Sequence, residues 1–212
     1  MSDQIIQNYI QIKNDIVSVS NKTNLIVVSK NQSETLIKQI LNLGQIHFGE
    51  NRIQEAIAKW PNLKELYPKT QLHFIGNIQS NKVNNIINLF DYVHSLDSKK
   101  LVEEFSKYEK KNKKNIKYFI QINLGDEVQK SGINIASFED FFNFCKLAEL
   151  NVVGLMCIPP INKPVENFFS LLKNLADKYN INNLSMGMSN DYKQAMLLGS
   201  TWVRIGSKIF SN

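Results

Sequence analysis

Lys30 is the residue whose type and position most directly suggest chemistry. It follows Ser29 and the continuous apolar run Leu25–Val28, and such a run is typical of a buried β-strand. We expect the amine to be held partly away from water at the end of this strand, which would lower its pKa and make it a better nucleophile. A neutral amine in this position suits a Schiff base, whereas the alternative is a lysine that simply begins a solvated loop.

A second group of candidates lies near the end of the sequence. Gly206 and Ser207 follow the expected strand 201–205, and the backbone N–H groups at this point commonly hold phosphate in α/β barrels. Ser189 opens the preceding helix, where its hydroxyl and its backbone N–H could add to the same site. The alternative is structural, with Ser189 and Asp191 as helix caps and Gly206 as a turn.

The sequence carries no recognisable motif for a metal or a nucleotide. Its three histidines, His47, His73 and His94, fall in expected strands at uneven spacing, which favours packed core residues over metal ligands. Cys145 and Cys157 are too few for a disulfide scaffold or a thiolate metal cage. We interpret them as reduced thiols of a cytoplasmic protein.

The overall composition excludes several classes of protein. The chain has 212 residues, of which 43% are hydrophobic and 21% charged, so it is long enough to bury a core and too apolar to be intrinsically disordered. No apolar run approaches the ~20 residues of a membrane span, and the N-terminus lacks the pattern of a secretory signal. We expect a single domain, residues 1–212, in the cytoplasm.

The net charge of +6 raises the question of a nucleic-acid or membrane partner. The densest basic run, 107–117, is typical of a solvated helix end and loop, and it lacks the interleaved aromatic residues of a nucleic-acid surface. We therefore expect neither partner, and a basic nucleic-acid-binding barrel is the disfavoured alternative. Only Arg52 and Arg204 are arginine, which marks them as candidates for roles that need a planar, permanently charged guanidinium.

The elements that must position these residues alternate along the chain. Short apolar runs predict strands, and each is followed by an amphipathic segment. A helix led by Ile5 and Ile6 precedes them, Ser33 and Ser137 are expected helix caps, and one helix is expected over 51–60. The expected strands are 25–28, 46–48, 72–75, 92–94, 118–122, 152–156, 183–185 and 201–205.

Eight strand–helix units in about 190 residues match a small (β/α)8 TIM barrel. The alternative is an open doubly wound sheet, which usually has five or six strands. Either fold is α/β with parallel strands, and either places the functional residues at the carboxyl ends of the strands.

Several segments, taken in order, resemble one known family. They are Val28–Lys30, Phe48–Asn51, His73–Gly76, Gln79–Lys82, Gly154–Met156, Leu184–Ser189 and Gly199–Gly206. Together they are similar to the pyridoxal phosphate homeostasis proteins, single-domain relatives of the alanine racemase barrel. The resemblance runs from about residue 25 to 210, and the ordered set is far more specific than any one segment.

This resemblance implies a barrel of the alanine racemase N-terminal type that carries pyridoxal 5′-phosphate (PLP). It maps the Schiff-base lysine onto Lys30 and places Arg204 against the pyridine nitrogen. It also places the phosphate near Ser189, Gly206 and Ser207. The remaining cofactor-binding candidate is Asn51, which would lie near the ring.

The resemblance also implies a function without strong catalysis. Arg204 cannot give up its proton, so it would leave the pyridine nitrogen unprotonated and the ring a poor electron sink. The chain is also too short for the second domain that brings a tyrosine base to alanine racemase. We therefore expect a monomer that holds PLP in intracellular PLP homeostasis, with apo-enzymes and free amino acids as partners. The alternative is a slow PLP-dependent amino-acid racemase, with His73 or Lys82 as its second acid or base.

Overall fold

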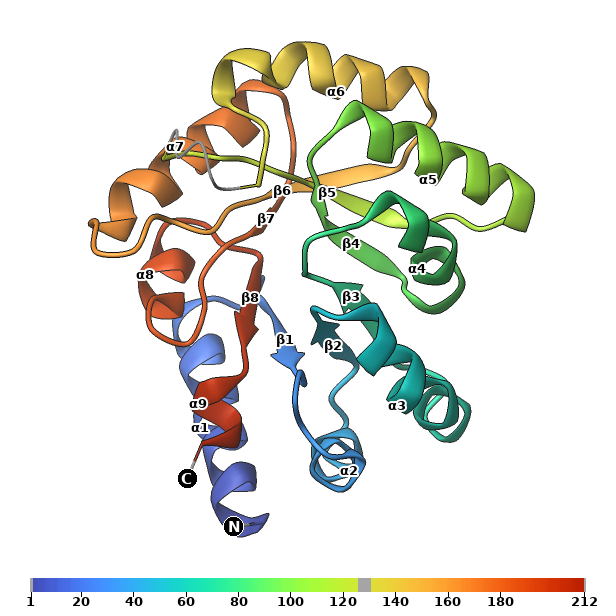
Figure 1. The fold of residues 1–212 in the computed structure, drawn as a ribbon. Helices are drawn as coiled ribbons and strands as arrows, with labels where there is room; N and C mark the ends of the chain where they lie inside the picture. The colour runs from blue at the N-terminus through green and yellow to red at the C-terminus, as the bar shows by residue number, and fades with distance from the viewer. Residues whose placement is uncertain (1, 126–130, 212) are drawn as a thin grey trace.

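The strands close into one parallel barrel in the computed structural model, which describes residues 2–125 and 131–211 (Figure 1). β1 pairs with both β2 and β8, so the open sheet is excluded and the barrel prediction is confirmed. The strands are β1 (Asn24–Val28), β2 (His47–Glu50), β3 (Gln71–Phe74), β4 (Tyr92–Leu96), β5 (Lys117–Gln121), β6 (Val152–Met156), β7 (Asn183–Ser185) and β8 (Trp202–Ile205).

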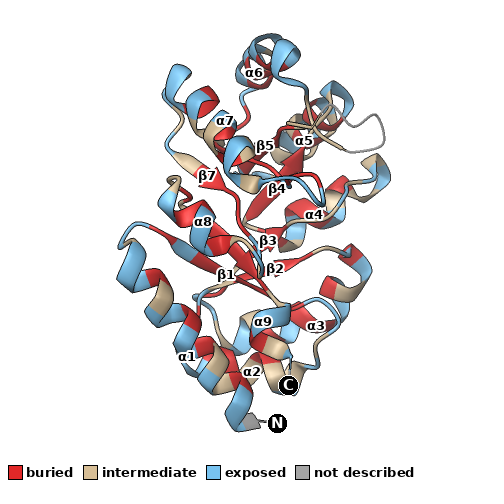
Figure 2. Cartoon of the chain, turned by 90° about the vertical axis from the view of Figure 1, so that its left-hand side faces the viewer, coloured by how far each residue is buried: buried red, intermediate tan, exposed pale blue. Residues whose placement is uncertain are grey.

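Helices follow the strands and cover the outside of the barrel. Buried residues line the strands and the helix faces that meet them, while exposed residues lie on the outer faces (Figure 2). This is the distribution expected when each amphipathic helix turns its apolar face to the barrel. The helices are α1 (Ser2–Val19), α2 (Glu34–Asn42), α3 (Ile53–Leu66), α4 (Val83–Leu89), α5 (Lys99–Asn112), α6 (Phe138–Leu147), α7 (Val165–Lys178), α8 (Tyr192–Leu197) and α9 (Ser207–Phe210), with 3₁₀ turns η1 (Ser80–Lys82) and η2 (Ile135–Ser137).

The N-terminal helix α1 packs against the C-terminal segment of the chain. It lies beside α9 (Figure 1), and the Asn8 amide donates to the carbonyl oxygens of Ile209 and Ser211 at 3.2 and 3.1 Å. Its apolar face is buried through Tyr9 and Ile12, among others. The predicted N-terminal helix is therefore present, and it packs against α9, which begins at the phosphate-site candidate Ser207.

Two helix predictions need correction. The helix expected to end at Trp60 continues as α3 to Leu66, with Pro61 inside it. Proline removes one helical hydrogen bond, but the buried side chain of Leu63 keeps the next turn packed. Ser137 makes no side-chain cap; Asn134 instead accepts from the Ser137 amide at 2.8 Å. The predicted cap at Ser33 is confirmed.

The interior is closely filled. Inside the barrel, Ile26, Tyr92, Phe119, Met156 and Trp202 form one cluster, and a larger apolar layer lies between the strands and the helices. The structure therefore encloses a packed core below the strand ends rather than a pore.

The two cysteines and the helices of the described residues bear on the expectations of reduced thiols and of a chain without a membrane span. Cys145 and Cys157 are free and buried, and burial raises the pKa of each thiol to about 12, so both stay protonated near neutral pH. Among residues 2–125 and 131–211, no helix combines the length and the apolarity needed to cross a membrane.

Candidate functional site

One cavity at the carboxyl ends of the strands brings together every cofactor-binding candidate from the sequence. Its volume is about 1070 Å³. The candidates that line it are Lys30, Asn51, Ser189, Arg204, Gly206 and Ser207. These residues follow β1, β2, β7 and β8 or lie on β8, so parallel barrel closure alone makes them neighbours.

Arg204 is the buried cation of this cavity. It is 4% exposed, and its Nη1 donates to the carbonyl oxygen and to Oγ of Ser185, both at 2.6 Å. Nη2 donates to the Cys157 carbonyl oxygen at 3.0 Å. Burial lowers the pKa of the guanidinium, and Cys157 and Asp191 partly oppose that shift. No ion pair joins Arg204 to a carboxylate within the described residues, so its charge is met by dipoles.

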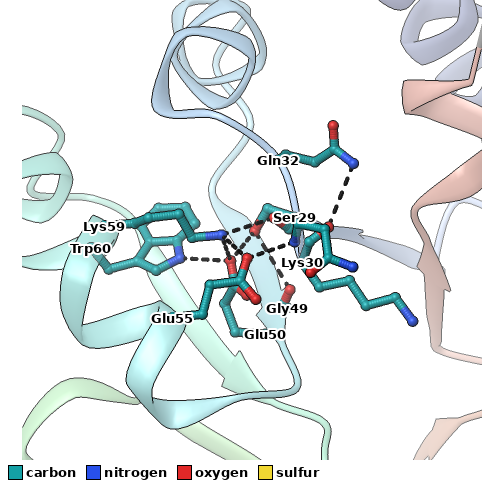
Figure 3. Close-up of polar contacts among 9 residues, drawn as sticks. Ser29, Lys30, Gln32, Gly49, Glu50, Glu55, Lys59 and Trp60 are labelled. Atoms are coloured by element: carbon teal, nitrogen blue, oxygen red, sulfur yellow. Dashed lines mark hydrogen bonds and ion pairs between the residues drawn. The ribbon is translucent and has the colours of Figure 1, made fainter.

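The expectation that the Lys30 amine is held partly away from water is wrong. The Lys30 side chain is exposed, because the chain turns outward directly after β1. Asn31 adopts a left-handed φ of 59°, and the Gln32 amide donates back to the Ser29 carbonyl oxygen at 3.1 Å. Figure 3 shows the Lys30 side chain extending away from the charged groups beneath it. The amine is therefore accessible at the cavity wall.

A buried charged cluster fixes the backbone on both sides of Lys30. Lys59 Nζ donates to the Ser29 carbonyl oxygen at 3.0 Å and pairs with Glu55 Oε1 at 2.8 Å. Glu55 Oε1 in turn accepts from the Asn31 amide at 2.6 Å. Burial acts to raise the pKa of Glu55, but these hydrogen bonds and the positive charges of Lys59 and Arg52 together outweigh it and lower that pKa. Two residues of α3 thus hold the peptide groups that flank Lys30 (Figure 3).

Glu50 lies at the centre of this cluster. Its side chain is fully buried, and Oε1 accepts from Lys59 at 2.8 Å, Trp60 at 3.0 Å and Ser29 Oγ at 2.7 Å. Sequence reasoning missed Glu50, Glu55 and Lys59 as supporting residues. The available signals were a carboxylate ending an apolar strand and a Glu–Lys pair four residues apart on an amphipathic helix.

Asn51 lines the cavity and carries an unpaired acceptor. Its Oδ1 is buried and has no hydrogen-bond partner among the described residues. A buried unpaired acceptor costs stability, which is a reason to expect a donor from a bound molecule. The Asn51 backbone is fixed by a close approach to Gly76, where any Cβ atom would collide with the Asn51 carbonyl oxygen.

The loops after β7 and β8 meet at the phosphate-site candidates. Ser207 Oγ donates to Ser189 Oγ at 2.9 Å, and the Lys208 amide donates to the same oxygen at 3.4 Å. The expectation that Ser189 opens α8 is wrong, because α8 begins at Tyr192 and Asp191 occupies the N-cap position without a side-chain cap. Asp191 Oδ1 instead accepts from the Met188 amide at 2.6 Å.

The residues considered for a second acid or base lie elsewhere. His73 is fully buried inside the barrel, and burial together with His94 lowers its pKa well below the usual value. Lys82 lies in η1. Neither belongs to the described lining of the cavity.

Comparison with models of known protein families matches residues 2–211 to the N-terminal domain of alanine racemase. The chain belongs to this family. The predicted barrel of the alanine racemase N-terminal type is therefore confirmed. The 36% identical Aquifex aeolicus relative confirms the resemblance to the pyridoxal phosphate homeostasis proteins.

Members and neighbours of the alanine racemase N-terminal family agree with this result. The pyridoxal phosphate homeostasis protein of Aquifex aeolicus is 36% identical over 200 residues, which cover 90% of this chain and 87% of that protein. PipY of Synechococcus elongatus, in a structure with PLP bound, has a TM-score of 0.88 and is 31% identical; the match covers 98% of this chain and 100% of that one. A Clostridium difficile alanine racemase has a TM-score of 0.76 at 13% identity, a likeness of fold alone, and the match covers 57% of that chain.

Proposed function

We propose that this chain binds PLP in the cavity at the strand ends and takes part in intracellular PLP homeostasis. The observation that carries the proposal is the convergence of all six candidate residues on one cavity with a buried arginine in its wall. The names of its relatives support it, as does the PLP-bound structure of PipY.

The groups around the cavity fit the chemistry of PLP. This cofactor supplies an aldehyde that condenses with an amine to form a Schiff base and water, and Lys30 provides an accessible amine. Arg204 is a permanent donor suited to the pyridine nitrogen. Ser189, Ser207 and the backbone at Gly206 would hold the phosphate, and the unpaired Asn51 Oδ1 would accept from the ring substituents.

The same groups favour a holding role over efficient catalysis. A guanidinium does not transfer its proton to the ring nitrogen, so the ring draws electrons weakly. The described cavity lining includes neither His73 nor Lys82 as a second acid or base. The proposal therefore describes a monomeric cytoplasmic protein that keeps a reactive aldehyde bound and exchanges it with amino acids and apo-enzymes.

Lys30→Ala should remove the covalent attachment of PLP. The wild-type protein should show an absorption band at roughly 420 nm that borohydride reduction fixes onto the Lys30 peptide. Lys30 is exposed, so its replacement should change stability by less than about 0.5 kcal/mol. Lys82→Ala is the matched control and should keep the full band, since Lys82 is not among the described cavity residues.

Two outcomes would overturn this proposal. Absence of the band in wild-type protein supplied with PLP would exclude the cofactor, and a full band in Lys30→Ala would exclude the lysine. Chiral chromatography of alanine or serine then separates the two functions, because racemisation above roughly 1 s⁻¹ would indicate an enzyme.

A further inference from the structure

A continuous chain of hydrogen bonds crosses the barrel interior and ends at Arg204. His47 Nδ1 lies 3.0 Å from His73 Nε2, and His73 Nδ1 lies 2.9 Å from His94 Nε2. His94 Nδ1 lies 2.8 Å from Ser185 Oγ, which accepts from Arg204 Nη1 at 2.6 Å. The chain begins at the first residue of β2 and ends on β8, so it connects the amino end of the barrel to the cavity.

The three histidines of this chain are neutral near pH 7. Burial lowers the pKa of His47 to about 4 and holds the pKa values of His73 and His94 well below the usual range. A neutral imidazole has one N–H donor and one acceptor nitrogen. Each ring can therefore pass a hydrogen bond from one neighbour to the next, and the direction of the chain is set at one of its ends.

Arg204 sets that direction. A guanidinium only donates, so Ser185 Oγ accepts from it and must place its own hydrogen elsewhere. Within the described residues, the available acceptor is His94 Nδ1. His94 then carries its hydrogen on Nε2 and donates to His73 Nδ1, and His73 donates from Nε2 to His47 Nδ1. The reverse direction would leave the Ser185 hydrogen without an acceptor in a fully buried side chain.

We propose that this oriented chain of neutral dipoles stabilises the buried charge of Arg204, and that His94 is a positioning residue for the guanidinium. Every lone pair in the chain faces Arg204 and every N–H or O–H points away from it. Aligned hydrogen bonds polarise one another and strengthen the bond to the charged end. The chain thus holds a buried cation in one orientation at the cavity. Its effect on the ligand rests on the proposed PLP function.

Packing is the competing explanation for these histidines. The His73 ring stacks on Tyr92 and the His94 ring stacks on Phe119, each pair with ring centroids 4.2 Å apart. A packing role needs the aromatic ring, whereas the proposed role needs the hydrogen bonds. Two substitutions of His94 separate these requirements.

The first test measures the ring tautomers without any ligand. Nitrogen-15 NMR of histidine-labelled protein near neutral pH should find His47, His73 and His94 all protonated on Nε2. A hydrogen on Nδ1 of His94 would overturn the proposed direction whether or not the protein binds PLP.

The second test compares His94→Gln with His94→Phe. Glutamine offers an acceptor and a donor and can continue the chain, whereas phenylalanine keeps the stacking on Phe119 and breaks the chain. We expect His94→Phe to weaken PLP binding by about tenfold or more, as for the loss of a charge-assisted hydrogen bond, and His94→Gln to restore most of it. The absorption maximum of bound PLP should shift in His94→Phe alone.

Ser185→Ala provides a smaller change in case His94→Phe does not fold. It should weaken PLP binding to a similar extent and release His94 from its single tautomer in the NMR spectrum. Wild-type affinity in both His94→Phe and Ser185→Ala would overturn the positioning role while leaving the PLP function intact. Failure of the wild-type protein to bind PLP would count against the proposed function, and the tautomers would still decide the direction of the chain.

Discussion

Lys59→Met should lower the free energy of unfolding by about 3–5 kcal/mol, the cost of leaving a buried charge without its partner. The Glu50 side chain is fully buried, and Lys59 is its ammonium partner at 2.8 Å. Without it, the donors left to the carboxylate among the described residues are the neutral groups Ser29 Oγ and Trp60 Nε1. Methionine fills a similar volume, so the loss should come from the charge rather than from a cavity. Urea denaturation measures it directly.

Two variants give this prediction its controls. Glu50→Gln combined with Lys59→Met removes both charges and should recover the part of the loss that comes from the unpaired Glu50 carboxylate, because the neutral amide can still accept from Ser29 and Trp60. The bonds of Lys59 to the Ser29 carbonyl oxygen and to Glu55 stay lost in both variants. Lys38→Met breaks an exposed pair with Glu34, where the two atoms are 3.7 Å apart, and should cost less than about 1 kcal/mol. A Lys59→Met loss as small as that of Lys38→Met would contradict a net stabilising role for the buried pair.

Stability should fall as the pH drops from about 6.5 toward about 4. The folded-state pKa of His47 is about 4 against an ordinary value of 6.5, and those of His73 and His94 are also lowered. Over this window the unfolded chain binds protons that the folded chain does not. Each such proton contributes up to about 1.4 kcal/mol per pH unit. Above pH 7 this contribution is fully present and should not vary.

The groups that face the histidines support this direction. Burial is the main cause of the low pKa at each ring, and the positive charges of Lys117 and Lys13 add to it at His47, against the smaller opposite effect of Asp91. Arg204 adds to it at His94. Most of these charges repel a proton, so protonation of the chain is disfavoured from both of its ends.

Urea denaturation at a series of pH values tests the prediction. His47→Gln should reduce the slope between pH 6 and 5 by about one proton. The pKa of Asp15 is lowered to about 2. Its contribution to stability is lost only as the pH falls from about 3.8 toward about 2, so it can be separated from the contribution of the histidines at higher pH. An unfolding free energy that stays constant from pH 7 to 5, or a slope unchanged by His47→Gln, would contradict the assignment of neutral histidines.

The barrel could be predicted from the sequence because its signal is local and repeated. Each buried strand is a short apolar run, and each helix has apolar residues that recur at helical spacing. Parallel closure then places every strand end at one rim, so the candidates Lys30, Asn51 and Arg204 converge on one cavity without any knowledge of their contacts. The resemblance to a known family then pointed to particular cofactor-binding residues. The pattern of strands and helices alone left that choice open.

The histidine chain could not be predicted in this way. Its members lie on β2, β3 and β4, and they meet only when the strands are placed in register inside a closed barrel. The uneven spacing of His47, His73 and His94 therefore suggested separate core residues. The exposure of Lys30 depends on a left-handed turn at Asn31, a backbone choice that the apolar strand before it does not determine.

The pairing of β1 with β8 means that the barrel cannot close before β8 has been synthesised. As the polypeptide leaves the ribosome, β1 emerges with one edge unpaired, and its partner Trp202–Ile205 follows only after the other strands of the barrel. Lys30 is thus made well before Arg204, Gly206 and Ser207. Long-range pairing of this kind is slow and exposes strand edges. A ligand held between the first and last strands would bind only finished barrels and would draw late folding intermediates toward the native state.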